Sequence, residues 1–100
     1  MKLQKGTRVL VTAGASGIGR SIVGTFYNQG AAVHVCDIFD KHLPALLKDF
    51  PGIGFTQTDV SVPMEVDHLF EEVRTNLKGL EVLINNVGIA GPTARVENIS

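Results

Sequence analysis

The chain has 100 residues, of which 44% are hydrophobic and 19% charged, and its formal net charge is -1. This composition is typical of a globular protein and excludes a disordered or collagen-like chain; the length suffices for one domain. The nine Lys and Arg residues are scattered, so we expect no basic surface for nucleic acid or for an anionic membrane.

The amino-terminal segment carries no signature of a secretory leader. Its apolar run is too short for a signal peptide, and no stretch approaches the length of a transmembrane span. Cys36 is the single cysteine, so it has no partner for an internal disulfide or at metal-binding spacing. We therefore expect a cytoplasmic protein.

The first half of the chain predicts two strands, each followed by a helix. The β-branched run over 8–12 predicts the first strand. A glycine-rich turn follows, and residues 17–30 predict a helix with Gly30 at its carboxyl end. Residues 32–37 predict the second strand, and 40–49 contain a short helix. The apolar face of the first helix consists of Ile18, Ile22, Val23 and Phe26.

The second half repeats this order. Residues 53–59 predict a third strand, and Ser61 is the expected N-cap of a helix that ends at Gly79. Residues 80–86 predict a fourth, apolar strand, and 88–100 form a loop rich in turn residues. The apolar face of this helix consists of Val66, Leu69, Phe70, Val73 and Leu77.

Strands that are apolar without alternation indicate a parallel sheet covered by helices on both faces. Right-handed crossovers then predict a doubly wound α/β fold of the Rossmann type, with strand order 3-2-1-4. Residues 1–100 form one domain or part of one. The fourth strand keeps a free apolar edge, which is an aggregation hazard, so we expect a longer chain whose remainder pairs with it.

Two features at the strand ends predict a nucleotide site. Gly14, Gly17 and Gly19 precede or open the first helix, where unpaired N–H groups and about half a positive charge favour an anion such as pyrophosphate. Asp37 closes the second strand, about twenty residues later, where dinucleotide-binding units place an acid on the adenosine ribose. The alternatives are a turn that serves only packing and a solvated loop acid.

The carboxylate of Asp37 also bears on which dinucleotide binds. It can accept hydrogen bonds from both ribose hydroxyls. It would repel a 2′-phosphate by a few kcal/mol, since two unit charges ~4 Å apart interact by ~4 kcal/mol at an effective dielectric of ~20. The expected cofactor is therefore NAD rather than NADP.

Three stretches together resemble one protein family. TAGASGIG (12–19) resembles the Thr-Gly-x-x-x-Gly-x-Gly signature of the short-chain dehydrogenases/reductases, in the spacing of their single-domain branch. DV (59–60) resembles their adenine-binding pair, and NNVG (85–88) resembles their Asn-Asn-Ala-Gly. The resemblance spans essentially the whole chain.

The resemblance implies a cofactor site made of backbone and side chains from four segments. Members that prefer NADP often carry a basic residue at the position of Ser16 or after the second strand, where Ile38 stands; this agrees with NAD. The implied site has Gly14, Ser16, Gly17, Ile18 and Gly19 around the pyrophosphate, Asp37 on the ribose, Asp59 and Val60 at the adenine, and Asn86 and Gly88 beside the ribose and the approach to nicotinamide.

The chain departs from the family pattern at two positions. Ala13 replaces the first glycine, and we expect a negative φ there because its methyl disfavours the left-handed region. Val87 replaces the usual alanine. Both changes bear on cofactor affinity. The family's catalytic Ser and Tyr-x-x-x-Lys lie beyond these residues, and Tyr27, the only tyrosine, is expected to be a packing residue.

The implied activity is hydride transfer between NAD(H) and a small-molecule alcohol or carbonyl compound, in a homodimer or homotetramer, with residues 1–100 supplying the NAD(P)-binding part. The alternative is a non-catalytic NAD(P)-binding or scaffold protein of the same fold. His34 and Cys36 share one face of the second strand, a pattern more typical of core residues than of a metal site. The remaining polar candidates are expected to be solvated: His42, His68, Glu71, Glu72 and Arg74.

Overall fold

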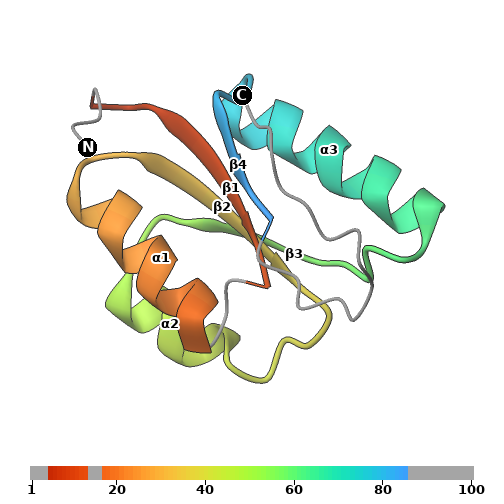
Figure 1. Cartoon of the computed structure of the whole chain (residues 1–100), viewed down its shortest axis with the longest axis horizontal. Coiled ribbons are helices and arrows are strands. Elements are labelled where there is room, and N and C mark those ends of the chain that lie inside the picture. Colours follow the sequence, from red (N-terminus) through yellow and green to blue (C-terminus); the bar gives the residue numbers. More distant parts are fainter. Residues whose placement is uncertain (1–4, 14–16, 86–100) are drawn as a thin grey trace.

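The computed structural model describes residues 5–13 and 17–85 (Figure 1). All strand pairings within them are parallel, in the order β3-β2-β1-β4, which confirms the predicted doubly wound α/β fold. In chain order the elements are β1 (Arg8–Thr12), α1 (Gly17–Asn28), β2 (Ala32–Asp37), α2 (Leu43–Asp49), β3 (Gly54–Gln57), α3 (Pro63–Leu77) and β4 (Val82–Ile84).

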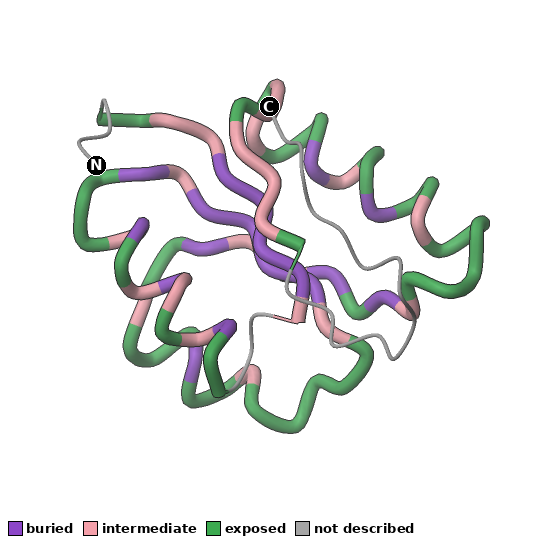
Figure 2. Tube along the Cα trace, viewed as in Figure 1, coloured by how far each residue is buried: buried purple, intermediate pink, exposed green. Residues whose placement is uncertain are grey.

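Helices cover both faces of the sheet, with α1 and α2 on one face and α3 on the other (Figure 1). Successive strand residues point to opposite faces, so Val9 of β1 belongs to the core under α1 and α2, whereas Leu10 packs with Leu69 and Val73 of α3. The central strands are accordingly the most buried part of the chain (Figure 2). This double burial explains why their sequences are continuously apolar.

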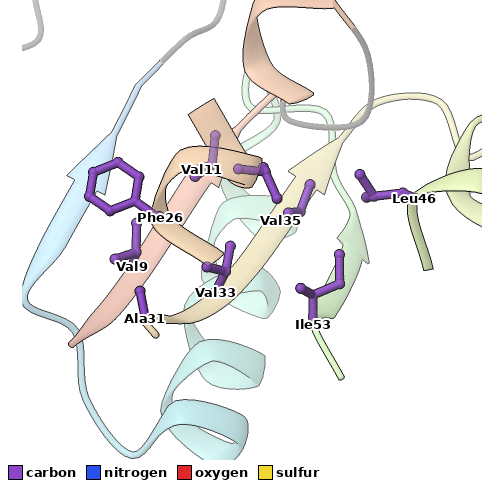
Figure 3. Packing of buried hydrophobic residues seen from close by; sticks show 9 residues of the cluster. Val9, Val11, Phe26, Ala31, Val33, Val35, Leu46 and Ile53 are labelled. Atoms are coloured by element: carbon purple, nitrogen blue, oxygen red, sulfur yellow. The ribbon is translucent and has the colours of Figure 1, made fainter. Parts of the chain in front are cut away.

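The larger core lies between the sheet and the layer formed by α1 and α2 (Figure 3). Phe26 from α1 and Leu46 from α2 close over β-branched side chains of the two central strands. None of the helices in the described part of the chain is long and apolar enough to cross a membrane. The buried members of this core are Val9, Val11, Val23, Phe26, Ala31, Val33, Val35, Leu46 and Ile53.

Helix α1 ends at a glycine, as predicted. Gly30 has a φ of +89°, and its N–H donates to the carbonyl of Tyr27 at 3.0 Å, while the N–H of Ala31 donates to the carbonyl of Phe26 at 3.1 Å. This pair of hydrogen bonds is the Schellman motif, which needs a left-handed residue between helix and strand.

Three sequence predictions about the helices are wrong in detail. Ile18, in the first turn of α1, is 73% exposed rather than part of the α1 core face. Phe70 is likewise exposed on α3. The N-cap of α3 is Val62 rather than Ser61; the hydroxyl and N–H of Ser61 donate instead to Asp59 Oδ1, at 2.6 and 2.9 Å.

An exposed ion pair ties the start of β1 to the segment that joins α3 and β4. The backbone N–H and the Nε of Arg8 both donate to Glu81 Oε1, at 2.8 and 3.0 Å, and Nη2 pairs with Oε2. Nη1 donates to the carbonyl of Lys78, the C-cap of α3, at 2.9 Å. A Cβ on Gly79 would lie 2.6 Å from Nη1, so a side chain at this position would displace the guanidinium.

Two neighbouring leucines of α2 provide a matched test of the core. Leu46 is 0% exposed and Leu47 is 41% exposed. We expect Leu46→Ala to lower the free energy of unfolding by about 2–5 kcal/mol, because it removes buried methyl groups and leaves a cavity. Leu47→Ala should cost less than about 1 kcal/mol. Chemical denaturation of both variants measures the difference, and equal losses would contradict the core assignment.

The ion pair predicts an acid-dependent contribution to stability. Hydrogen bonds from the Arg8 guanidinium and backbone N–H lower the pKa of Glu81 from 4.5 to about 2. Because the folded pKa is the lower one, the contribution is complete above pH 4.5 and is lost as the pH falls towards 2. The denaturation midpoint of Glu81→Gln should therefore fall less over this range than that of wild type. Glu71→Gln on the exposed face of α3 is the control; a fall in Glu81→Gln as large as in wild type would contradict the prediction.

Candidate functional site

The carboxyl ends of β1, β2 and β3 open onto a cleft of about 220 Å³. Parallel strands that pair in register end at the same edge of a sheet, so the segments that follow them meet there. Three predicted site residues, Asp37, Asp59 and Val60, are brought together by this arrangement. The cleft is lined by Ala13, Cys36, Asp37, Ile38, Thr58, Asp59, Val60 and Ser61.

Asp37 is held at the end of β2 by its backbone and its side chain. Its carbonyl accepts the N–H of Thr58 at 2.9 Å, which carries the sheet pairing one step beyond β3. Its Oδ1 accepts the N–H of Phe39 at 3.2 Å. The turn after β2 is further held by Gln57, whose Nε2 donates to the carbonyl of Ile38 at 3.0 Å. These hydrogen bonds therefore hold the carboxylate and its backbone in place at the rim of the cleft.

Asp59 organises the turn between β3 and α3. The Ser61 hydroxyl and backbone N–H both donate to its carboxylate and lower its pKa, so Asp59 is ionised at neutral pH. Its own N–H donates to Glu65 Oε1 in the first turn of α3, at 2.7 Å. This turn leaves Val60 exposed at the cleft.

The predicted site residues of the glycine-rich turn are only partly described. Gly17, Ile18 and Gly19 open α1, and Gly17 has a φ of +61°, a conformation that a side chain would disfavour. Because the first N–H groups of a helix have no intrahelical acceptor, this end of α1 can bind an anion. The predicted site residues Gly14, Ser16, Asn86 and Gly88 lie outside the described residues.

Ala13 contradicts the prediction of a negative φ. Its φ is +53°, in the left-handed region, where an L-residue pays roughly 1–2 kcal/mol. Ala13 directly follows the last residue of β1, Thr12, and a glycine would adopt its conformation without strain.

Of the eight residues that line the cleft, sequence reasoning assigned Asp37, Asp59 and Val60 to the site; Cys36 and Thr58 are among the five that it missed. Both are buried residues at strand ends next to predicted site residues, and that adjacency was the available signal. Burial raises the pKa of the Cys36 thiol to about 12, so the thiol is neutral and unreactive at neutral pH.

Contacts between α1 and the segment that contains Phe50 confirm one packing prediction. The ring of Tyr27 packs on Phe50 with centroids 5.2 Å apart, and its hydroxyl donates to the carbonyl of Pro51 at 2.7 Å. Arg20, in the first turn of α1, pairs with Asp49 and lies over the ring of Phe50. Both side chains thus bind the α1 helix to α2 and the turn after it.

The strand end of β1 is also joined to that of β4. The Thr12 hydroxyl lies 3.0 Å from Asn85 Oδ1 and 3.3 Å from the carbonyl oxygen of Ile84. Thr12 is buried, so this contact fixes the first asparagine of the NNVG stretch at the same edge of the sheet as the cleft.

The model of the short chain dehydrogenase family matches residues 7–100. The chain belongs to this family. Members use NAD(P) as cofactor, and the parallel sheet with its cleft at the carboxyl edge is the fold that binds such dinucleotides.

Individual short-chain dehydrogenases show how the chain compares. It is 37% identical to a tropinone reductase homolog of Arabidopsis thaliana over 96% of this chain and 38% of that protein. It is 34% identical to L-fucose dehydrogenase of Bos taurus over 95% of this chain and 35% of that protein. The chain thus spans between a third and two fifths of the length of these curated relatives.

A solved structure is also similar to this chain. A short chain dehydrogenase from Mycobacterium smegmatis superposes with a TM-score of 0.79 at 30% identity, covering 87% of this chain and 38% of that one. This chain therefore shares the fold of a short-chain dehydrogenase over most of its length.

The strain at Ala13 can be tested by replacing this alanine with glycine and comparing the effect with that of the same replacement in a helix. Ala13→Gly should raise the free energy of unfolding by up to about 1 kcal/mol, because relief of the left-handed strain exceeds the entropy that glycine adds to the unfolded chain. Ala45→Gly, in the exposed part of α2, should lower it by about 1 kcal/mol. Denaturation of both variants measures the contrast; destabilisation by both would show that Ala13 is unstrained.

Proposed function

We propose that this chain is the dinucleotide-binding part of an oxidoreductase that transfers a hydride between NAD(H) and a small-molecule alcohol or carbonyl compound. The observation that carries the proposal is the cleft, where Asp37 and Asp59 converge and no Lys or Arg is found among the described lining residues. A dinucleotide needs acceptors for its ribose hydroxyls, which these carboxylates supply, and an anion site for its pyrophosphate, which the amino end of α1 supplies.

The charges around the cleft favour a ribose without a 2′-phosphate. The Asp37 carboxylate can accept hydrogen bonds from two adjacent hydroxyls, each worth ~1.5–3 kcal/mol for a charged acceptor. A phosphate in the same place would be repelled by several kcal/mol before screening. The residue after Asp37 is Ile38, which offers no compensating cation. NAD is therefore the proposed cofactor.

The remaining contacts follow from the geometry of the sheet edge. The amino end of α1, with Gly17, Ile18 and Gly19, would hold the pyrophosphate through backbone N–H groups. Val60 and Ile38, both exposed at the cleft, would contact the faces of the adenine. On the family pattern, Gly14 and Ser16 would add to the pyrophosphate site, and Asn86 and Gly88 to the ribose and nicotinamide end.

The cofactor supplies the hydride acceptor or donor, and this part of the chain binds and orients it. By the resemblance, the proton-transferring Ser, Tyr and Lys lie in the part of the protein that follows these residues. A homodimer or homotetramer, which the resemblance implies, and a place in the cytoplasm are part of the same proposal.

Asp37 gives the sharpest test of the cofactor. Asp37→Asn in the intact protein should weaken NADH binding by about ten- to hundred-fold, since a charged acceptor of ribose hydroxyls is lost. It should also narrow the gap between NADH and NADPH, because the repulsion of the 2′-phosphate disappears. Fluorescence titration with both cofactors measures the two affinities.

Asp40→Asn is the matched control, because it removes the same charge from the exposed turn three residues later. Its affinity for NADH should equal that of wild type. Tighter binding of NADPH than of NADH by wild type would overturn the role of Asp37. Tight NADH binding without turnover of any alcohol or carbonyl compound would favour a non-catalytic binding protein instead.

A further inference from the structure

A line of polar side chains runs from the buried middle of the sheet to the surface of α3. His34, at the centre of β2, is 0% exposed. Its Nε2 lies 2.8 Å from Thr56 Oγ1 on β3, and the Thr56 hydroxyl donates to Glu72 Oε1 on α3 at 2.7 Å. Glu72, expected from the sequence to be part of a solvated face, therefore contacts the sheet. Three elements meet through this line.

The hydrogen bonds fix where the protons are. An ionised carboxylate only accepts, so the single proton of the Thr56 hydroxyl is directed at Glu72. The hydroxyl oxygen must then accept from His34, which requires a proton on Nε2 and leaves a lone pair on Nδ1. Within residues 5–13 and 17–85, Nδ1 is the buried side-chain atom that has no hydrogen-bond partner.

The surroundings of Nδ1 cannot accommodate a second proton. The imidazole fills the space left by the missing side chain of Gly54 on the neighbouring strand: a Cβ there would lie 2.8 Å from Cε1 and closer still to Nδ1. Protonation would place an N–H without an acceptor, and a positive charge, in a site away from water.

Few charged groups offset this cost. Glu72 is the charged group on α3 that faces His34, and its other oxygen lies 3.6 Å from Nε2 of His68. From β1 the register partner of His34 is Leu10, β3 contributes Gly54 and Thr56, and the Cys36 thiol on β2 is neutral. The balance lowers the pKa of His34: loss of hydration lowers it, and the charge of Glu72 opposes this only partly.

We propose that His34, Thr56 and Glu72 form an acid-sensitive latch that holds α3, and the turn over 58–62 that leads into it, against the sheet. The latch closes only around a neutral imidazole. When the turn and α3 open, His34 becomes hydrated and can bind a proton, so acid favours the open form. This latch does not depend on which cofactor the protein binds.

The direction of the pH effect follows from the lowered pKa. Above the ordinary pKa of about 6.5, His34 is neutral in the closed and the open form, and the latch has its full strength. As the pH falls from 6.5 towards the lower pKa of the closed form, only the open form gains a proton and the latch weakens. Glu81 and Asp59 have pKa values lowered from the ordinary 4.5 and 3.8, so they gain their protons only at a more acidic pH.

Hydrogen exchange on the intact protein tests the latch. Protection factors, which remove the intrinsic pH dependence of exchange, are compared at pH 7.5 and 5.5. In wild type the amides of α3 and of the 58–62 turn should lose protection several-fold at pH 5.5, whereas α1 keeps its protection. His34→Gln, whose amide can still donate to Thr56 but does not titrate in this range, should show no such loss. His42→Gln, at an exposed position, should behave as wild type.

Wild type that keeps its α3 protection at pH 5.5, or His34→Gln that loses it as wild type does, would overturn the proposal. If His34→Gln does not fold, the nitrogen chemical shifts of the imidazole in wild type decide. A proton on Nε2, with no titration near pH 6.5, is the expected result. A proton on Nδ1, or a pKa at the ordinary value, would overturn the latch.

Discussion

The pairing of β1 with a parallel strand on each side is the constraint on which the candidate site depends. Val9 lies opposite Val33 of β2 and Val82 of β4, and the middle of the strand is buried on both faces. With β3 in register beyond β2, the chain leaves each strand at the same edge. The acids at 37 and 59, far apart in sequence, both line the cleft because β2 and β3 pair in this register.

At the carboxyl edge of the sheet, the groups that favour an anion and the groups that repel one lie on different elements. The first turn of α1 contains no acidic residue, and the unpaired N–H groups of a helix start favour an anion. The ends of β2 and β3 carry Asp37 and Asp59, which favour hydroxyl and amino groups and repel phosphate. A molecule with phosphates in its middle and a sugar and base at one end matches this order.

The sequence alone predicts the order of the elements and the position of Asp37, because both follow from local patterns: apolar runs, glycine at helix ends, and an acid closing a strand. The sequence alone does not predict a conformation or a side-chain partner that depends on a contact with another part of the chain. Ala13 takes a left-handed φ that its own residue type disfavours. Glu72 looks like one member of a charge run, and only the packing of α3 on the sheet turns it towards Thr56. Ser61 is a residue type that favours the N-cap position, but its hydroxyl donates to Asp59 and the N-cap is Val62.

Helix α3 shows how polar contacts position an element that buries little. Of its 15 residues only Leu69 and Val73 are buried, so apolar burial holds the helix on the sheet but leaves its orientation weakly defined. Polar ties at its start, middle and end supply the orientation. Because Glu65 at the start of α3 is hydrogen-bonded to Asp59, which lines the cleft, a shift of α3 would move this side of the cleft more directly than it would move α1. The ties are Glu65 with Asp59, Glu72 with Thr56, and Lys78 with Arg8.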